Sequence, residues 1–229
     1  RYGSTPTNLP TGLPDWIMKN TNLLLLAVVA AALVSCGTTQ EDRWAAEDAT
    51  RSGFELHQAG DYEGALATYT EAIQLNPPSA LPWNNRGCAR IQLGDYDGAI
   101  GDLSQAVWLK PDDPHYRNNL GVARHHLAQY ELALVEFDEA ISLSPETARF
   151  YNNRGLARFR LNDDVGALAD YDRALELEPD YAVVYRERAM VWEARGDLQA
   201  AEADRDTFAR LGQETEFTLP SVEEEVPTN

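Results

Sequence analysis

The chain has 229 residues, with 37 acidic against 19 basic side chains and a formal net charge of −18. This acidic balance argues against nucleic acid and anionic lipid headgroups as partners, because both favour basic surfaces. The part that follows Cys36 is long enough for one elongated domain.

Residues 1–17 have no hydrophobic periodicity, and the chain does not begin with methionine. Met18, in contrast, heads a segment that has all the parts of a secretory signal. We therefore expect translation to start at Met18 and residues 1–17 to be an over-extended reading frame.

A weakly basic start at 18–22 is followed by an unbroken apolar run over 23–34 and then by Ser35 and Cys36. The run is too short to cross a bilayer core of about 30 Å, but it fits the apolar part of a signal peptide. Residues 18–35 resemble a bacterial lipoprotein signal with its lipobox. An ordinary signal, or an anchor helix with an incidental cysteine, is the alternative.

The lipoprotein resemblance implies that Cys36 is the lipidated first residue of the mature protein. Its diacylglycerol and an added acyl chain such as palmitate would anchor the protein stably in a membrane. Gly37 follows, and no aspartate stands there. The resemblance then implies delivery to the outer membrane, on its periplasmic face, with residues 36–45 as a tether.

From Ala46 onward the sequence repeats every 34 residues, with a proline near the end of each of the first four periods. A period of this length is typical of a solenoid built from pairs of helices. The fold is therefore expected to be all-α, in five units: 46–79, 80–113, 114–147, 148–181 and 182–211.

Each unit keeps the same residue types at the same positions. The second unit has Trp83, Gly87, Gly94-Asp95-Tyr96, Ala99, Ala106 and Pro111. This pattern resembles the tetratricopeptide repeat (TPR), which implies a right-handed α-solenoid that binds a protein or peptide in a concave groove.

The residue types explain how a unit folds. Glycine and aspartate between the two helices end the first helix and cap the second. The glycine at position 8 lets the helices approach closely, and we expect the alanine at position 20 to face it. In the fifth unit Phe208 replaces a small residue, so 198–211 is predicted to be a closing helix with Asp204 and Arg205 facing water. The acidic residues 212–229 are predicted to be disordered.

Arginine at position 7 occurs together with aspartate at position 23 in three units. These pairs are Arg86 with Asp102, Arg154 with Asp170, and Arg188 with Asp204. We predict that each pair forms an ion pair between the helices of a unit or between neighbouring units.

The resemblance implies that positions 2, 5, 6, 9, 12 and 13 of the first helices face the groove. The asparagines there could bond the backbone of an extended peptide, or they could brace neighbouring helices. Only Asn119 and, loosely, Arg149 match the family's clamp for a terminal carboxylate. The predicted groove residues are Asn84, Asn85, Asn118, Asn119, His125, Arg149, Asn152, Asn153, Phe159, Arg160 and Arg186.

The sequence has no glycine-rich phosphate loop, zinc-ligand spacing or nucleophile elbow. His125 and His126 are adjacent and diverge by about 100° on a helix, so they cannot chelate one metal ion together. We therefore expect no enzyme activity, cofactor, metal or small-molecule substrate.

The sequence thus predicts a lipid-anchored periplasmic scaffold or adaptor that binds a segment of a partner protein, with a role in envelope biogenesis. The alternatives are a structural envelope protein that associates with itself, or a pilotin-like assembly factor for a secretin.

Overall fold

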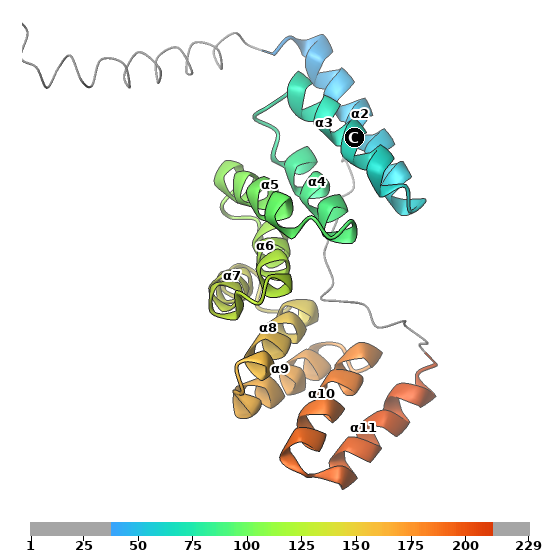
Figure 1. The fold of residues 1–229 in the computed structure, drawn as a ribbon, viewed down its shortest axis with the longest axis vertical. Helices are drawn as coiled ribbons and strands as arrows, with labels where there is room; N and C mark the ends of the chain where they lie inside the picture. Colours follow the sequence, from blue (N-terminus) through green and yellow to red (C-terminus); the bar gives the residue numbers. More distant parts are fainter. Residues whose placement is uncertain (1–37, 213–229) are drawn as a thin grey trace, which may run out of the picture. The chain divides into compact units, whose positions relative to one another are not determined.

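The computed structural model describes residues 38–212, which contain ten helices and no strand (Figure 1). The predicted signal peptide, Cys36 and the tail from residue 213 lie outside the described residues. The helices are α2 (Gln40–Gln58), α3 (Tyr62–Leu75), α4 (Ala80–Gln92), α5 (Tyr96–Leu109), α6 (Pro114–His126), α7 (Tyr130–Leu143), α8 (Ala148–Arg160), α9 (Asp164–Leu177), α10 (Ala182–Arg195) and α11 (Leu198–Arg210).

Five helix pairs match the five predicted units, and the all-α solenoid is confirmed. The boundary at Ala46 is wrong, however, because α2 begins at Gln40. Residues 40–45, predicted as part of a tether, are helical. They contain no glycine or proline, and Glu41 and Asp42 in the first turn interact favourably with the helix dipole.

The turn between the helices of a unit follows the predicted chemistry. Gly94 has a φ of 77°, a left-handed conformation that glycine adopts without steric cost. The Asp95 side chain then accepts a hydrogen bond of 3.0 Å from the Gly98 N–H and caps α5. Ala128 and Asn162 adopt the same left-handed region in the units that lack this glycine.

The close contact between paired helices is confirmed, but its partner was predicted wrongly. A Cβ placed on Gly121 would lie 2.6 Å from Cε1 of Phe137, the residue at position 24 of the same unit. The alanine at position 20, Ala133, is fully buried elsewhere in the core. The glycine therefore leaves space for a ring, and the small alanine serves packing between units.

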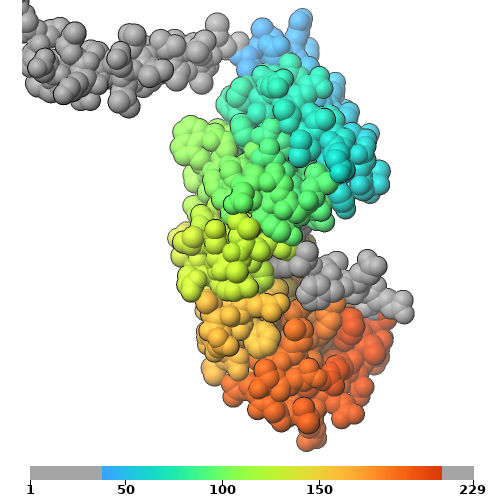
Figure 2. Space-filling model, in the orientation of Figure 1, coloured from blue at the N-terminus to red at the C-terminus, as the bar shows by residue number. Residues whose placement is uncertain are grey.

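The first helices form the inner layer of the stack. Among α3 to α11, alternate first helices contact one another (α4 with α6, α6 with α8 and α8 with α10), whereas alternate second helices do not. The first helices therefore lie closer together, and the stack curves around them. Successive units appear in Figure 2 as consecutive colour bands. We call the exposed side of α4, α6, α8 and α10 the inner face.

The closing helix α11 differs from prediction at one residue. Arg205 is exposed and forms an ion pair with Glu193, as expected for a residue facing water. Asp204 is only 6% exposed, because Arg188 on α10 holds its carboxylate. Phe208 packs its ring against the Arg186 guanidinium, with 5.7 Å between Cζ and the ring centroid.

Candidate functional site: the inner face of the first helices

The predicted arginine–aspartate pairs are confirmed in all three units. Arg86 contacts Asp102 at 2.7 Å, and the equivalent pairs Arg154–Asp170 and Arg188–Asp204 are each 2.6 Å long. Each pair joins the two helices of one unit.

All three arginines also reach the preceding unit. Arg86 donates a hydrogen bond of 3.0 Å to Thr70 Oγ1 on α3. Arg154 bonds Asp138 on α7 at 2.7 Å, and Arg188 bonds Asp172 on α9 at 2.6 Å. The same guanidinium therefore connects the helices within a unit and the units to one another.

The third unit has Leu120 instead of arginine, and other arginines take over. Glu136 of α7 is contacted at 3.4 Å by both Arg117 and Arg124. Burial raises the pKa of Glu136, and the two guanidinium groups oppose that shift. The arginines on the outer side of the first helices are thus committed to structure.

All six predicted groove asparagines are buried, and five of them are hydrogen-bonded to one another. The exception is Asn152, which is 4% exposed and whose buried Oδ1 accepts no hydrogen bond within residues 38–212. The position-6 amide of one unit donates to the position-5 amide of the unit before it: Asn119 to Asn84 at 2.9 Å, and Asn153 to Asn118 at 2.8 Å. Within a unit, Asn84 donates to Asn85 at 2.9 Å and Asn118 to Asn119 at 3.4 Å.

These bonds form one chain of amides that runs from Asn153 on α8 through α6 to Asn85 on α4. Asn119 also donates to Cys88 Sγ at 3.4 Å. In these bonds the asparagines brace neighbouring helices, which is one of the two roles that the sequence analysis left open. The two bonds between units, Asn119 to Asn84 and Asn153 to Asn118, hold adjacent first helices in register.

In the fifth unit this pattern changes, because Arg186 and Glu187 replace the two asparagines. Arg186 Nη2 lies 3.1 Å from Glu187 Oε1, and the carboxylate is only 4% exposed. Burial raises the pKa of Glu187, while Arg186 and Arg160 lower it. The sequence analysis did not single out Glu187, although its departure from the repeated asparagine was visible.

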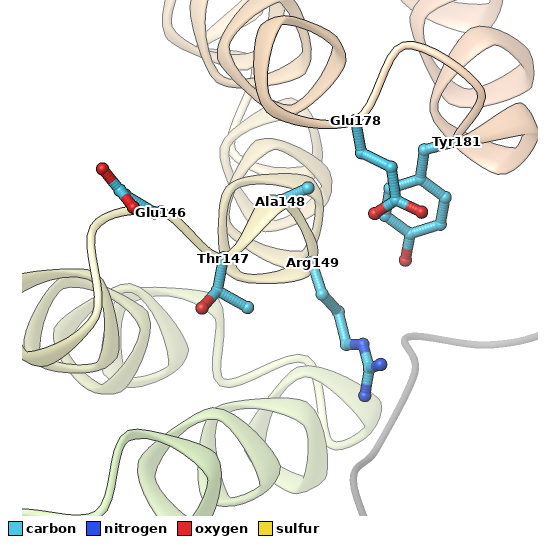
Figure 3. Close-up of a pocket in the computed structure, with 6 residues that line it drawn as sticks. All are labelled: Glu146, Thr147, Ala148, Arg149, Glu178 and Tyr181. Atoms are coloured by element: carbon cyan, nitrogen blue, oxygen red, sulfur yellow. The ribbon is translucent and has the colours of Figure 1, made fainter.

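Two further cationic groups of the inner face stand apart from the asparagine chain. Arg160 ends α8 and is exposed. Arg149, in the first turn of α8, lines a cavity of about 340 Å³ between two loops that connect successive units. Figure 3 shows Glu178 and Tyr181 from the loop before α10 on the same side of this cavity as Arg149. The sequence analysis missed these last two residues because it placed the groove on the first helices alone, and both residues lie in the loop between two units.

Two other predicted groove residues, Phe159 and His125, are more buried than predicted. Phe159 is partly buried against the core formed by α8, α9 and α10. His125 is 8% exposed and packs against the Tyr130 ring, with 5.1 Å between centroids. The prediction that His125 lies open in the groove is therefore wrong: its ring is buried and packs on Tyr130 at the start of α7.

His125 should make the fold sensitive to acid. Burial, then His126 and Arg160, lower its pKa from 6.5 to about 4. Between those two values the unfolded chain binds the proton more tightly, so stability is lost as the pH falls through this window. By pH 5 the loss should be roughly 2 kcal/mol relative to pH 7.5.

The comparison of the wild type with His125→Phe isolates this effect. Asp170, Glu136 and Glu187 have raised pKa values and act in the opposite sense in acid, but they are present in both proteins. Urea unfolding at pH 7.5 and pH 5 should show a smaller acid loss in the variant. Equal losses in the two proteins would mean that His125 is not the responsible group.

Within residues 38–212 no group of three or more His, Cys, Asp or Glu side chains is arranged to hold a metal ion. Nor does any helix there have the length and apolar character needed to cross a membrane. Cys88 is buried and forms no disulfide in the described part of the chain.

Three family comparisons match the repeats. The TPR repeat family matches residues 53–90 and 87–128, and tetratricopeptide repeat families match residues 114–147 and 148–181. The fifth unit and most of α2 lie outside these matches. A sequence comparison with curated proteins found no match.

Solved structures with the same fold include three examples that match this chain over most of their own length. MamA from Desulfovibrio magneticus is 20% identical with a TM-score of 0.66, over 78% of this chain and 100% of that one. PilF of Pseudomonas aeruginosa is 21% identical with a TM-score of 0.69, over 77% and 80% of the two chains. YrrB, described as a TPR protein with an unusual peptide-binding site, is 18% identical with a TM-score of 0.57, over 72% and 86%.

Family matches that together run from residue 53 to 181, repeated helix pairs and shared architecture lead to one conclusion: this chain belongs to the tetratricopeptide repeat proteins, a family of interaction scaffolds.

Proposed function

We propose that this protein is a lipid-anchored scaffold of the bacterial envelope that binds an extended segment of a partner protein on its inner face. The observation that carries the proposal is a contrast in charge. The helices α4, α6 and α8 contain eight arginines and no acidic residue, in a chain with a net charge of −18.

Six of these eight arginines bond acidic groups or carbonyls toward the second helices, as Arg86, Arg90, Arg117, Arg124, Arg154 and Arg158 do. The other two are Arg149, which lines the cavity beside α8, and Arg160, which is exposed at the end of α8. Arg186 follows on α10, where it pairs with Glu187. A cationic surface on an acidic molecule favours segments that bear carboxylates, whereas the acidic remainder of the molecule repels such segments.

The anchor in the proposal comes from the sequence before the solenoid. The apolar run and Cys36 support lipidation there, with residues 37–39 between the modified cysteine and α2. Fatty-acid labelling in bacteria should mark the wild type and leave Cys36→Ala unlabelled. A Cys36→Ala protein that still takes up the label would rule out this anchor.

The inner face can be tested by site-specific crosslinking in intact cells. A photo-reactive residue at Arg160 should capture a partner, whereas the same residue at Val165, which is 69% exposed on the outer helix α9, should not. Adding Arg149→Glu and Arg186→Glu to the Arg160 probe should reduce capture at least tenfold. The matched control is Arg43→Glu with Arg173→Glu, which makes the same charge change at exposed positions on α2 and on the outer helix α9.

Capture that survives Arg149→Glu with Arg186→Glu, in a chain with unchanged helicity, would mean that the partner binds elsewhere. Equal capture from Arg160 and Val165 would have the same meaning.

A further inference from the structure

The place where the described chain ends suggests a specific occupant for the inner face. The helix α11 runs antiparallel to α10, so its last turn lies beside the first turn of α10. Phe208 in that last turn packs on Arg186, an inner-face residue, with 5.7 Å between Cζ and the ring centroid. The chain therefore leaves the solenoid at Gly212 next to the cationic part of the inner face.

The sequence that follows has the complementary charge. Residues 213–229 contain no Lys, Arg or His. Their acidic residues are Glu214, Glu216, Glu223, Glu224 and Glu225. The side chains of opposite charge are Arg149, Arg160 and Arg186, which belong to the two first helices nearest to Gly212.

Residues 213–229 are long enough to reach the arginines of the inner face. Fully extended, residues 213–229 can span about 55 Å. First helices of neighbouring units are about 10 Å apart, so the path from α10 across α8 to α6 needs only about 20 Å. Pro220 and Pro227 also restrict the segment toward extended conformations, which suit a strip of side chains from successive helices.

We propose that residues 213–229 dock on the inner face of their own molecule, with the glutamates opposite Arg149 and Arg186, and compete there with the partner. This inference rests on the proposed function, because it assigns the resting occupant of the same surface. A tethered segment acts at an effective concentration in the millimolar range, so even weak docking would exclude a partner that binds with similar strength.

The test uses a synthetic peptide with the sequence of residues 213–229, labelled with a fluorophore and followed by anisotropy. It is titrated with the full chain and with a full chain in which the five tail glutamates are changed to glutamine. The neutral tail should leave the inner face open, so this variant should bind the peptide at least tenfold more tightly than the wild type. Raising the salt concentration from 50 mM to about 500 mM should weaken that binding, because the contacts are ionic.

Two further variants in the neutral-tail chain locate the binding. Arg149→Glu with Arg186→Glu should abolish peptide binding, and Arg43→Glu with Arg173→Glu should leave it unchanged. Equal peptide affinity for the wild-type and neutral-tail chains would overturn the proposal. So would peptide binding that survives Arg149→Glu with Arg186→Glu.

The same experiments also distinguish the tail of the same molecule from other possible occupants of the inner face. If the difference between wild-type and neutral-tail chains grows with protein concentration, the tail of a second copy is the occupant, and docking within one molecule is wrong. A neutral-tail chain that ignores the peptide but still captures the envelope partner refutes tail docking alone. A chain that binds its tail peptide but captures no partner in cells refutes the proposed function alone.

Discussion

Replacing Asp170 by alanine is expected to lower the free energy of unfolding by about 4 kcal/mol. The Asp170 side chain is 2% exposed, and its carboxylate accepts hydrogen bonds from Arg154 at 2.6 Å and from Arg158 at 2.9 Å. Removing it leaves two partly buried guanidinium groups facing a space that was occupied by a charge. Urea unfolding followed by circular dichroism measures the loss.

The matched control is Asp172→Ala, two residues along the same helix. Its carboxylate bonds Arg188 at 2.6 Å but is 57% exposed, so water replaces the lost contact and the cost should stay below about 1 kcal/mol. If the two variants lose the same stability, burial does not make the Asp170 network important.

The pKa of Asp170 explains why the number of its contacts with arginine does not measure how much they stabilise the fold. The effect of removing Asp170 is the better measure. Burial raises this pKa, and the arginines Arg154 and Arg158 lower it only in part. Desolvation therefore consumes much of the Coulombic attraction in the intact protein. The large expected cost of Asp170→Ala is mainly the penalty of leaving the arginines without their counter-charge.

Asn119→Ala is expected to cost about 3 kcal/mol. The amide is fully buried, donates to Asn84 and Cys88, and accepts from Asn118. Truncation removes these bonds and leaves a small cavity at the contact of α4 with α6. Because repeat units are stabilised by their neighbours, hydrogen exchange should accelerate first in those two helices.

Gln92→Ala supplies the comparison for this variant. Gln92 is exposed at the end of α4 and is also a first-helix amide, so its loss should cost less than about 0.5 kcal/mol. A cost for Asn119→Ala within that range would show that the amide chain does not brace the helices. Exchange that accelerates equally in all helices would instead show that the units unfold as one.

Residues that recur at one position could be predicted from the chain alone. Arginine at position 7 and aspartate at position 23 change together between units, so the pair Arg154–Asp170 could be predicted and is confirmed. Asn152 and Asn153 recur in the same way, but recurrence alone did not separate a bracing amide from a peptide-binding one. The choice depends on which amide of the next unit comes within bonding distance.

Contacts that depend on side-chain size across an interface were predicted less well. Gly121 was expected to face an alanine because both residues are small, but it faces Phe137. Asp204 was expected to face water in a terminal helix, yet Arg188 draws it inward. In both cases the rotation of one helix about its axis decides the contact, and the repeat period does not specify that rotation.

The sequence by itself determined the number of units, the turns between their helices and the Arg–Asp pairs, because each of these depends on residues at fixed separations along the chain. Only the tertiary structure decided which polar groups of the first helices bond one another and which remain on the inner face. The physical reason is the stacking of neighbouring units. It brings Asn119 to Asn84 and Asn153 to Asn118, through distances and rotations that no single repeat contains.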